Sequence, residues 1–508
     1  MAYTPRLPDY EHQTRAKLKA RGKEAFGFLL EYGTGKTKIS LDEFGELAYE
    51  KELDDLLIIA PSGMYNNWSE DSPEKISQIT EHLDPELRSR LHVATWKSGN
   101  KSSERAVAEL LANKDPRRPR ALVMNIEALS RVDRAVSACQ EFLLGKRGNG
   151  GRAYMLVDES TTAKSMKAQR TQNVIDIGKK ARVRRILTGL ITPRSPLDLF
   201  AQFEYLDWKI LGFHTYRSFV ARYAITKTAE FGSWEDHQKK ARGEENDLRT
   251  VRNVIVGYRH VEELQQKIAP HSFRALKSEC LQLPEKVYLV RQVEHTPQQK
   301  RMYAEIREFA TAQIEGEAYV TPLSVIAQML RLHQINCGWV VDDEKIERDV
   351  ESNRLRELLA VLDEHGGKAI IWAHYNRAVS QICEALKREY GPGSVAAYWG
   401  GNKTTRGEDE KRWLSDKECR FMVASQGAGA RGNTWIQASL VIYYANNHDL
   451  ELRLSSEDRA HRAGLKHSVT YVDLMTRGTV DEKMVQSFRK KIDMASLITG
   501  DTYKSWLI

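Results

Sequence analysis

The stretch FGFLLEYGTGKTKISLDEF (residues 26–44) decides the fold of this chain. An apolar run leads into the loop Gly33-Thr34-Gly35-Lys36-Thr37, and the residues that follow are compatible with a helix. Glycines let a backbone wrap closely around phosphate oxygens, and the amides at the start of a helix point at such an anion. The stretch therefore predicts a strand, a phosphate-binding loop and a helix, with Lys36 reaching the β- and γ-phosphates and the Thr37 hydroxyl binding magnesium.

A second chemical signal is YMLVDEST (154–161), an apolar strand that ends in Asp158 and Glu159. A carboxylate at the end of a strand can hold magnesium, usually through water, and a neighbouring carboxylate can deprotonate an attacking water. Alone, such a pair usually marks a solvated loop. Downstream of a phosphate loop it indicates hydrolysis of a nucleoside triphosphate, where catalysis is mostly positioning and charge stabilisation.

A third signal lies far along the chain, in SSEDRAHRAGLKHSVTYVDLM (455–475). Arg459 and Arg462 are three positions apart and are expected to share one face of a helix. Most such pairs are solvated helix faces. If a second domain faces the first across a nucleotide, however, these arginines can stabilise charge on the γ-phosphate.

Short apolar runs alternate with longer amphipathic stretches along the 508 residues. One group of runs lies before about residue 200 and a second group lies after about residue 365. Continuous apolar strands separated by helices are typical of parallel sheets that are covered on both faces. We therefore predict the α/β class, with two parallel sheets and helical insertions between them. Examples of the runs are LLIIA (56–60), AYMLVD (153–158), KAIIWAH (368–374) and LVIYYA (440–445).

The composition excludes several classes of protein. With 41% hydrophobic and 29% charged residues, the chain is neither disordered nor fibrous. Its five cysteines form no CxxC pattern, which argues against a disulfide framework or a zinc module. The first residues lack the apolar core of a signal peptide, and the apolar runs are too short to span a membrane. We expect no membrane partner and a cytoplasmic location, in a bacterial host if a phage encodes the chain.

The formal net charge of +8 permits a polyanionic partner without requiring one. All of the surplus lies in residues 151–290, which carry 24 basic and 16 acidic side chains. Between Ser160 and Arg194 there are nine basic residues against one acid, Asp176. The run either contacts the backbone of a nucleic acid or is a solvated surface, and the sequence leaves both readings open.

In their order, these motifs resemble the superfamily-two helicase-like ATPases, specifically the Snf (Swi/Snf-type) DNA translocases in their short phage or bacterial form. The resemblance runs from about Leu7 to Gly500. LPDYEHQ (7–13) places Gln13 where the family reads adenine, and EDRAHRAG (457–464) closely matches the family's arginine motif. Two further segments resemble the family's coupling segments, RILTGLITPRSPLDLF (185–200) with Thr188 and Gly189, and ASQGAGARGNTW (424–435) with Gly429 and Gly432.

The resemblance implies two RecA-like lobes. Residues 1–290 would form an ATP-binding lobe with a helical insertion around 205–285, and residues 291–508 a second lobe with an insertion around 295–355. It implies ATP and Mg²⁺ as cofactors, and a monomer that binds double-stranded DNA, branched or forked forms included.

The resemblance also assigns roles to single residues. Glu159 would be the general base, with Lys36, Arg459 and Arg462 completing the catalytic set. Nucleotide binding would fall to Gln13, Gly33, Thr34, Gly35, Lys36, Thr37 and Asp158, with Thr37 and Asp158 holding the metal. Candidate DNA contacts are Ser62, Lys164, His374, Ser425 and Gln426.

The chain departs from the family pattern at four positions. Thr161 stands where the family has histidine, and Ser455 stands where it has glutamine. Arg431 and Asn433 replace apolar residues in the second coupling segment. These changes leave the hydrolytic residues intact, so we expect hydrolysis to be preserved and its coupling to movement to differ in detail.

The leading hypothesis is a hydrolase, an ATP-driven motor on double-stranded DNA that remodels DNA or protein–DNA complexes. One alternative is a strand-separating or branch-migrating helicase with the same ATPase, although no wedge segment is evident. A second alternative, from another class, is a non-catalytic DNA-binding scaffold, which the intact set of Lys36, Asp158, Glu159 and Arg462 disfavours. A small-molecule kinase does not fit the length of the chain or its second predicted sheet.

Overall fold

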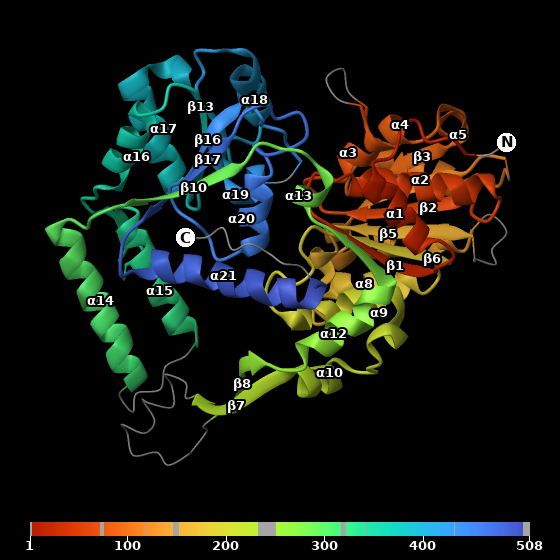
Figure 1. Cartoon of the computed structure of the whole chain (residues 1–508), viewed down its shortest axis with the longest axis horizontal. Helices are drawn as coiled ribbons and strands as arrows, with labels where there is room; N and C mark the ends of the chain where they lie inside the picture. Colours follow the sequence, from red (N-terminus) through yellow and green to blue (C-terminus); the bar gives the residue numbers. More distant parts are fainter. Residues whose placement is uncertain are drawn as a thin grey trace. The chain divides into compact units, whose positions relative to one another are not determined.

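A computed structural model describes residues 3–71, 76–115, 117–145, 152–231, 250–315, 322–342, 344–430 and 432–500. The chain divides into two compact units (Figure 1). The first unit contains the chain up to Tyr223, His260–Leu283 and the end of the last helix from Lys491. The second unit contains Ala224–Arg259 and Pro284–Lys490. The lobe limits 1–290 and 291–508, with their insertions, stay a proposal.

The first unit is built on a seven-stranded sheet in the order β3-β4-β2-β5-β6-β1-β9. Every pairing between neighbouring strands is parallel, so the carboxyl ends of all these strands lie at one edge of the sheet. The strands are β1 (Ala25–Leu30), β2 (Asp55–Ala60), β3 (His92–Thr95), β4 (Arg120–Asn125), β5 (Ala153–Asp158), β6 (Val183–Leu187) and β9 (Ser272–Ala275).

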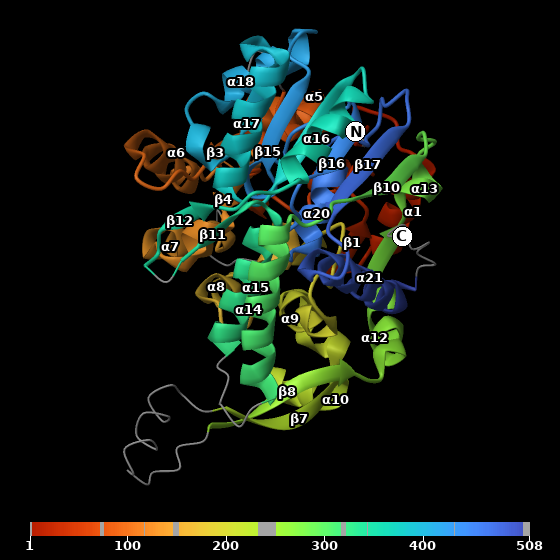
Figure 2. The same cartoon turned by 90° about the vertical axis from the view of Figure 1, so that its left-hand side faces the viewer.

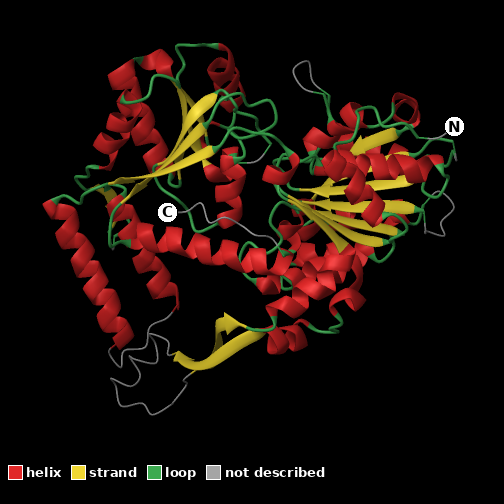
Figure 3. Cartoon of the chain, in the orientation of Figure 1, coloured by secondary structure: helices red, strands yellow, loops and turns green. Residues whose placement is uncertain are grey.

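Helices cover both faces of this sheet, as Figure 3 shows. This arrangement explains why β1, β2 and β5 are buried at every position and read as unbroken apolar runs. The helices are α1 (Glu11–Ala20), α2 (Lys36–Tyr49), α3 (Asn66–Ser69), α4 (Gln78–His82), α5 (Pro85–Arg90), α6 (Lys101–Ala112), α7 (Asp133–Leu143), α8 (Gln169–Gly178), α9 (Leu199–Leu211), α10 (Tyr216–Tyr223), α12 (Val261–Ile268) and α13 (Lys277–Cys280).

The second unit has a six-stranded sheet in the order β10-β17-β16-β13-β15-β14, again parallel throughout. Its strands are β10 (Lys286–Gln292), β13 (Lys368–Ala373), β14 (Val395–Tyr398), β15 (Phe421–Ser425), β16 (Ala438–Tyr443) and β17 (Val469–Met475). Its helices are α14 (Pro297–Glu315), α15 (Pro322–Asn336), α16 (Arg354–Asp363), α17 (Asn376–Tyr390), α18 (Arg406–Ser415), α19 (Gln426–Gly429), α20 (Leu450–Glu457) and the first part of α21 (Val480–Thr499).

Two antiparallel ribbons complete the second unit. One pairs β7 (Ala224–Phe231) with β8 (Thr250–Tyr258), and the other pairs β11 (Trp339–Val341) with β12 (Glu347–Asp349). The first ribbon and helices α14 and α15 are prominent in Figure 2. The predicted α/β class, two parallel sheets with helical insertions, is confirmed.

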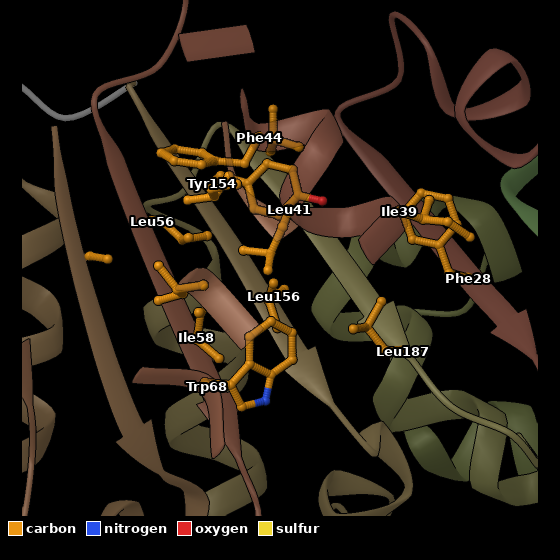
Figure 4. Close-up of a cluster of buried hydrophobic side chains, with 14 of the residues drawn as sticks. Phe28, Ile39, Leu41, Phe44, Leu56, Ile58, Trp68, Tyr154, Leu156 and Leu187 are labelled. Carbon is orange, nitrogen blue, oxygen red and sulfur yellow. The ribbon is translucent and has the colours of Figure 1, made fainter. Parts of the chain in front are cut away.

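A buried ion pair connects helix α2 to the first sheet. Arg185 of β6 donates from Nη2 to Glu43 Oε1 at 2.6 Å and from Nε to Oε2 at 2.9 Å. The two side chains are only 1% and 8% exposed. Tyr154 of β5 donates its hydroxyl to the same carboxylate at 2.8 Å. The position of α2 is thus fixed against two strands, in the core that Figure 4 shows around Tyr154 and Phe44.

We expect Glu43→Ala to destabilise the first unit by about 3–5 kcal/mol, because it leaves the Arg185 guanidinium buried without its counter-ion. The matched control is Glu52→Ala, which removes the partner of Arg182 from an ion pair whose side chains are 41% and 42% exposed. That change should cost less than about 1 kcal/mol. Urea unfolding followed by circular dichroism measures both, and equal shifts of the midpoint would refute the assigned role of the buried pair.

Candidate active site

The phosphate loop lies between the end of β1 at Leu30 and the start of α2 at Lys36. Gly33 and Gly35 have φ of +77° and +87°, a region that glycine adopts without strain. Lys36 donates from Nζ to the Leu30 carbonyl at 2.9 Å and to the Glu31 carbonyl at 3.2 Å. Within the described chain no side chain caps α2 at Gly35, so its first amides can donate to an anion. The amides at the start of α2 and the Lys36 ammonium fit the phosphates of a nucleoside triphosphate.

Gln13 lies directly against this loop. Its Nε2 donates to the Thr34 carbonyl at 3.4 Å, and its Oε1 accepts from the Tyr10 amide at 3.0 Å. A Cβ added to Gly35 would lie 2.2 Å from Gln13 Nε2, so a larger residue there would displace the Gln13 amide. His12, which the sequence did not single out, also reaches the Thr34 carbonyl through Nε2 at 2.8 Å. The segment expected to read the base therefore contacts the segment expected to bind phosphate.

A charged cluster fixes residues 9–13 to helix α2. Asp9 accepts hydrogen bonds from Lys38 and from Lys17, the latter at 2.7 Å, and Lys38 also pairs with Asp42 at 2.6 Å. Burial opposes ionisation of Asp9, but the hydrogen bonds from the two lysines hold its pKa below its usual value. The cluster fixes the start of the chain beside the phosphate loop.

The carboxylate pair lies at the end of β5, where both Asp158 and Glu159 are buried. Asp158 Oδ2 accepts from the indole Nε1 of Trp68 at 3.1 Å, and Oδ1 accepts from the Glu159 amide at 3.0 Å. Glu159 has φ +44°, a left-handed conformation that is strained for a residue with a side chain and is common at functional sites. One strand, β6, separates β5 from β1, so about 10 Å lies between the two strand ends.

The segment after β6 lies at the same edge of the sheet. Thr188 is fully buried, and its hydroxyl donates to the Leu190 carbonyl at 3.0 Å. A Cβ on Gly189 would lie 2.7 Å from the ring of Tyr32. That ring centroid is 5.0 Å from Lys36 Nζ, so Tyr32 links the predicted coupling segment to the phosphate loop. The sequence carried no signal for this contact.

A second link joins the carboxylate segment to the segment after β6. Ser160 donates its hydroxyl to Gln202 Oε1 at 2.6 Å, and Gln202 donates from Nε2 to the Ile191 carbonyl at 2.9 Å. Thr161, which replaces the family's histidine, is buried beside Ser160. The residues that follow β5 and β6 are thus connected through one buried amide.

The basic run 160–194 is divided between the two edges of the first sheet. Lys164, Lys167 and Arg170 follow the carboxyl end of β5, whereas Lys179 and Lys180 precede β6. Helix α8, whose ten residues begin at Gln169 and include Arg170, rises about 15 Å from the first group towards the second. Arg185 is occupied by its buried ion pair. Contact of the rest of the run with a nucleic-acid backbone stays a prediction.

The candidate DNA contacts of the first unit differ in exposure. Ser62 is exposed, and its amide donates to Glu127 Oε2 at 3.0 Å. Lys164 is half-buried, near Asp198, whose pKa burial raises while hydrogen bonds and the nearby cation oppose the rise. Both residues follow strand ends at the edge that carries the phosphate loop.

The arginine motif of the second unit follows helix α20. The expectation that Arg459 and Arg462 share a helix face is wrong, because α20 ends at Glu457 and both arginines lie in the turns after it. They instead share Asp458, whose Oδ2 is 3.0 Å from Arg459 Nη2 and 3.4 Å from Arg462 Nε. A carboxylate, rather than a helix face, brings them together.

The two arginines differ in exposure and in the hydrogen bonds that they make within the second unit. Arg459 is 6% exposed and donates to the Asn433 carbonyl at 2.7 Å and to the Ser455 carbonyl at 3.0 Å. Arg462 is 30% exposed and donates to the Thr434 hydroxyl at 2.9 Å. Arg462 can therefore reach a ligand, whereas Arg459 connects α20 to the coupling segment.

The second coupling segment packs on a tryptophan pair. The rings of Trp372 and Trp435 are stacked, with centroids 5.6 Å apart. A Cβ on Gly429 would lie 2.9 Å from Trp435 and 3.1 Å from Trp372, so glycine is required there. Gly432 has φ +86°, and Arg431 lies outside the described residues.

The three DNA candidates of the second unit lie at or just after the ends of β13 and β15. His374 is exposed and Ser425 is half-buried. Gln426 is 1% exposed, and its Nε2 donates to the Ser456 hydroxyl at 3.4 Å. Its side chain therefore faces α20 in this conformation, and a direct DNA contact by Gln426 stays a prediction.

No three or more His, Cys, Asp and Glu side chains in the part of the chain that the structure describes gather as a metal-ligand cluster. No helix there combines the length and the apolar character that a membrane span needs.

The structure thus has two α/β units, each built on a parallel sheet, which is the architecture of a two-lobe, RecA-like protein. The chain belongs to the family described as "SNF2-related domain", which it matches over residues 21–339. It matches the "Helicase conserved C-terminal domain" over residues 351–464. The resemblance found in the motifs is confirmed.

Relatives are distant and longer. The chain is 22% identical to the CHD3-type chromatin-remodeling factor PICKLE of Arabidopsis thaliana, over 92% of this chain and 32% of the relative. It is 25% identical to the human DNA annealing helicase and endonuclease ZRANB3, over 98% of this chain and 41% of the relative. The chain thus spans less than half the length of these relatives.

A solved structure, the Sulfolobus solfataricus SWI2/SNF2 ATPase core in complex with dsDNA, is similar at 18% identity and a TM-score of 0.39. The similarity covers 99% of this chain and 95% of that one.

Because the two arginines make different contacts, their replacement by alanine should have different effects. Arg462→Ala should lower kcat for nucleotide hydrolysis by about 10³-fold and leave the melting temperature unchanged, because its side chain is partly exposed. Arg459→Ala should lower the melting temperature as well, because it removes buried hydrogen bonds. Steady-state phosphate release and calorimetric melting measure the two effects. A loss of ATP affinity alone in Arg462→Ala would contradict a role at the γ-phosphate.

Proposed function

We propose that this chain is an ATP-dependent motor that translocates on double-stranded DNA and remodels DNA or protein–DNA complexes. The observation that carries the proposal is the placement of the phosphate loop, the carboxylate pair and the Thr188 segment at one edge of a parallel sheet, in a chain of the SNF2-related family. The names of two relatives, a chromatin-remodeling factor and a DNA annealing helicase, support DNA as the partner.

In this proposal the first unit binds the nucleotide. Gln13 contacts the base, and the loop amides with Lys36 contact the phosphates. Thr37 and Asp158 would hold Mg²⁺, which supplies positive charge against the phosphates when bound. Glu159 accepts the proton of the attacking water, and its strained backbone fixes the carboxylate before the reaction.

The second unit supplies the remaining charge. Arg462 stabilises the charge that develops on the γ-phosphate, and Arg459 connects this arginine turn to the coupling segment of Gly429 and Gly432. Changes in occupancy of the nucleotide site are thereby transmitted to loops with candidate DNA contacts, Ser62 and Lys164 in the first unit and His374, Ser425 and Gln426 in the second. The protein acts as a monomer, and its DNA binding is tolerant of sequence and sensitive to salt.

One observation favours a second candidate, a strand-separating or branch-migrating helicase. Although the sequence showed no wedge, the structure has the two-stranded ribbon β7–β8 with exposed apolar side chains on both strands. These are Ile225, Val254, Ile255 and Val256. Apolar side chains can insert between base steps and partly unstack them.

The deciding experiment compares two displacement assays. A translocase removes the third strand of a DNA triplex but does not unwind a forked duplex, whereas the helicase alternative unwinds the fork. ATP hydrolysis is measured without nucleic acid and with single-stranded DNA, duplex DNA, forked DNA and RNA. We expect stimulation by duplex DNA, and stimulation by RNA alone would contradict the proposal.

Glu159→Gln is expected to lower turnover by at least about a hundredfold while ATP still binds, because the amide cannot accept the proton. Lys36→Ala should weaken ATP binding as well. Phosphate release and calorimetric ATP titration separate the two effects. Substantial turnover in purified Glu159→Gln protein would show that another group is the base. Binding of DNA without any turnover in the wild-type protein would instead support the scaffold alternative.

Because the basic run lies at two edges of the sheet, charge reversal at the two edges should affect DNA binding differently. Lys164→Glu with Lys167→Glu should weaken duplex DNA binding and reduce its salt dependence, because both residues follow β5 at the motif edge. Lys179→Glu with Lys180→Glu is the matched control at the opposite edge and should leave both unchanged. Fluorescence anisotropy at several salt concentrations measures them, and equal losses in the two double variants would contradict the proposed DNA path.

A further inference from the structure

The indole of Trp68 touches the carboxylate expected to hold the metal. Its Nε1 donates to Asp158 Oδ2 at 3.1 Å across 90 positions of sequence. Trp68 is 2% exposed and Asp158 is 5% exposed, so water competes little for this hydrogen bond.

The second oxygen of Asp158 is also bonded. The Glu159 amide donates to Oδ1 at 3.0 Å, so each carboxylate oxygen receives one N–H. A carboxylate oxygen has two lone-pair sites, so an oxygen that accepts one N–H can also bind a metal. Two donors on opposite oxygens fix the rotation of the carboxyl group about its Cβ–Cγ bond.

The indole itself cannot shift easily. Its ring packs among the buried side chains of the first sheet, beside Ile58 and Leu156, with the nitrogen at the edge away from Leu156 (Figure 4). The Trp68 amide donates to the Tyr65 carbonyl at 3.1 Å. The next residue, Ser69, shares a hydrogen bond of 2.6 Å with the Thr95 hydroxyl at the end of β3. The donor is therefore rigid.

We propose that Trp68 is a positioning residue for magnesium-dependent nucleotide binding. Mg²⁺ requires near-ideal octahedral geometry and exchanges its waters reluctantly, so a ligand carboxylate that is already oriented binds it with less loss of freedom. A rigid indole N–H provides that orientation and leaves the carboxylate charged, because it donates no ionisable proton. The inference rests on the proposed function, in which Asp158 serves the metal. The competing reading is that Trp68 only fills the core.

The test is the variant Trp68→Phe, which keeps an aromatic ring and removes the donor. Calorimetric titration with ADP at graded free Mg²⁺ measures the metal concentration that gives half of the full gain in affinity. We expect this concentration to rise about tenfold, with ADP affinity in EDTA unchanged. Phosphate release at saturating ATP should show the same displacement in Mg²⁺ dependence.

The matched control is Trp96→Phe in the same unit. Trp96 is 4% exposed, and its indole donates to the Ser98 hydroxyl at 3.2 Å instead of to a carboxylate. It should lose stability without any change in Mg²⁺ dependence. If Trp68→Phe shows the Mg²⁺ dependence of the wild-type protein, the positioning role is overturned and only the packing role remains.

A second measurement needs no variant. With ¹⁵N-labelled indoles in the wild-type protein, Mn²⁺ in place of Mg²⁺ with ADP should broaden one indole N–H resonance of the ten tryptophans far more than the others. Uniform broadening, or none, would overturn the inference. Failure of the wild-type protein to bind ADP with Mg²⁺ at all would instead refute the proposed function, so the two failures are distinguishable.

Discussion

The buried ion pair between Arg185 and Glu43 is the contact on which the geometry of the proposed nucleotide site of the first unit depends. Helix α2 starts at the phosphate loop, so its position decides where the first amides point. Arg185 also donates to the carbonyls of Lys23 and Glu24, just before β1. One guanidinium therefore sets the entry to β1 and the helix that leaves the loop. A buried ion pair adds little net stability, but loss of either partner leaves an uncompensated buried charge, so the paired arrangement is strongly favoured over a broken one.

The second unit uses the same physical solution. Arg453 of α20 is fully buried, pairs with Asp473 of β17 at 2.6 Å and donates from Nε to Glu457 at 2.9 Å. Its guanidinium lies 3.4 Å from the centre of the Tyr443 ring. Helix α20 ends where the arginine turn begins, as α2 begins where the phosphate loop ends. In each unit, a buried arginine–carboxylate pair fixes the helix that borders the proposed chemistry.

The sequence predicted what depends on local pattern and missed what depends on distant pairing. The runs at 56–60 and 153–158 are recognisable as strands because both faces of the sheet are covered and every position is buried. The contact of Trp68 with Asp158 left no local signal, because the two residues are separated by 90 positions. The expectation of one helix face for the two arginines was wrong for a tertiary reason. Beyond the end of α20, the Arg459 carbonyl accepts a hydrogen bond from the distant Trp435 amide at 2.8 Å.

The departure from the family pattern at Asn433 is tolerated because the backbone makes the contacts there. Asn433 stands in place of an apolar residue, yet its backbone carbonyl, rather than its side chain, accepts from Arg459 at 2.7 Å and from Arg462 at 3.4 Å. Any residue that preserves the backbone there can make these bonds. Thr434 is different, because its hydroxyl accepts from Arg462 and so its side chain matters. The substitution at residue 433 is therefore compatible with an intact arginine site. The side chain in this loop that matters for the contact with Arg462 is that of Thr434.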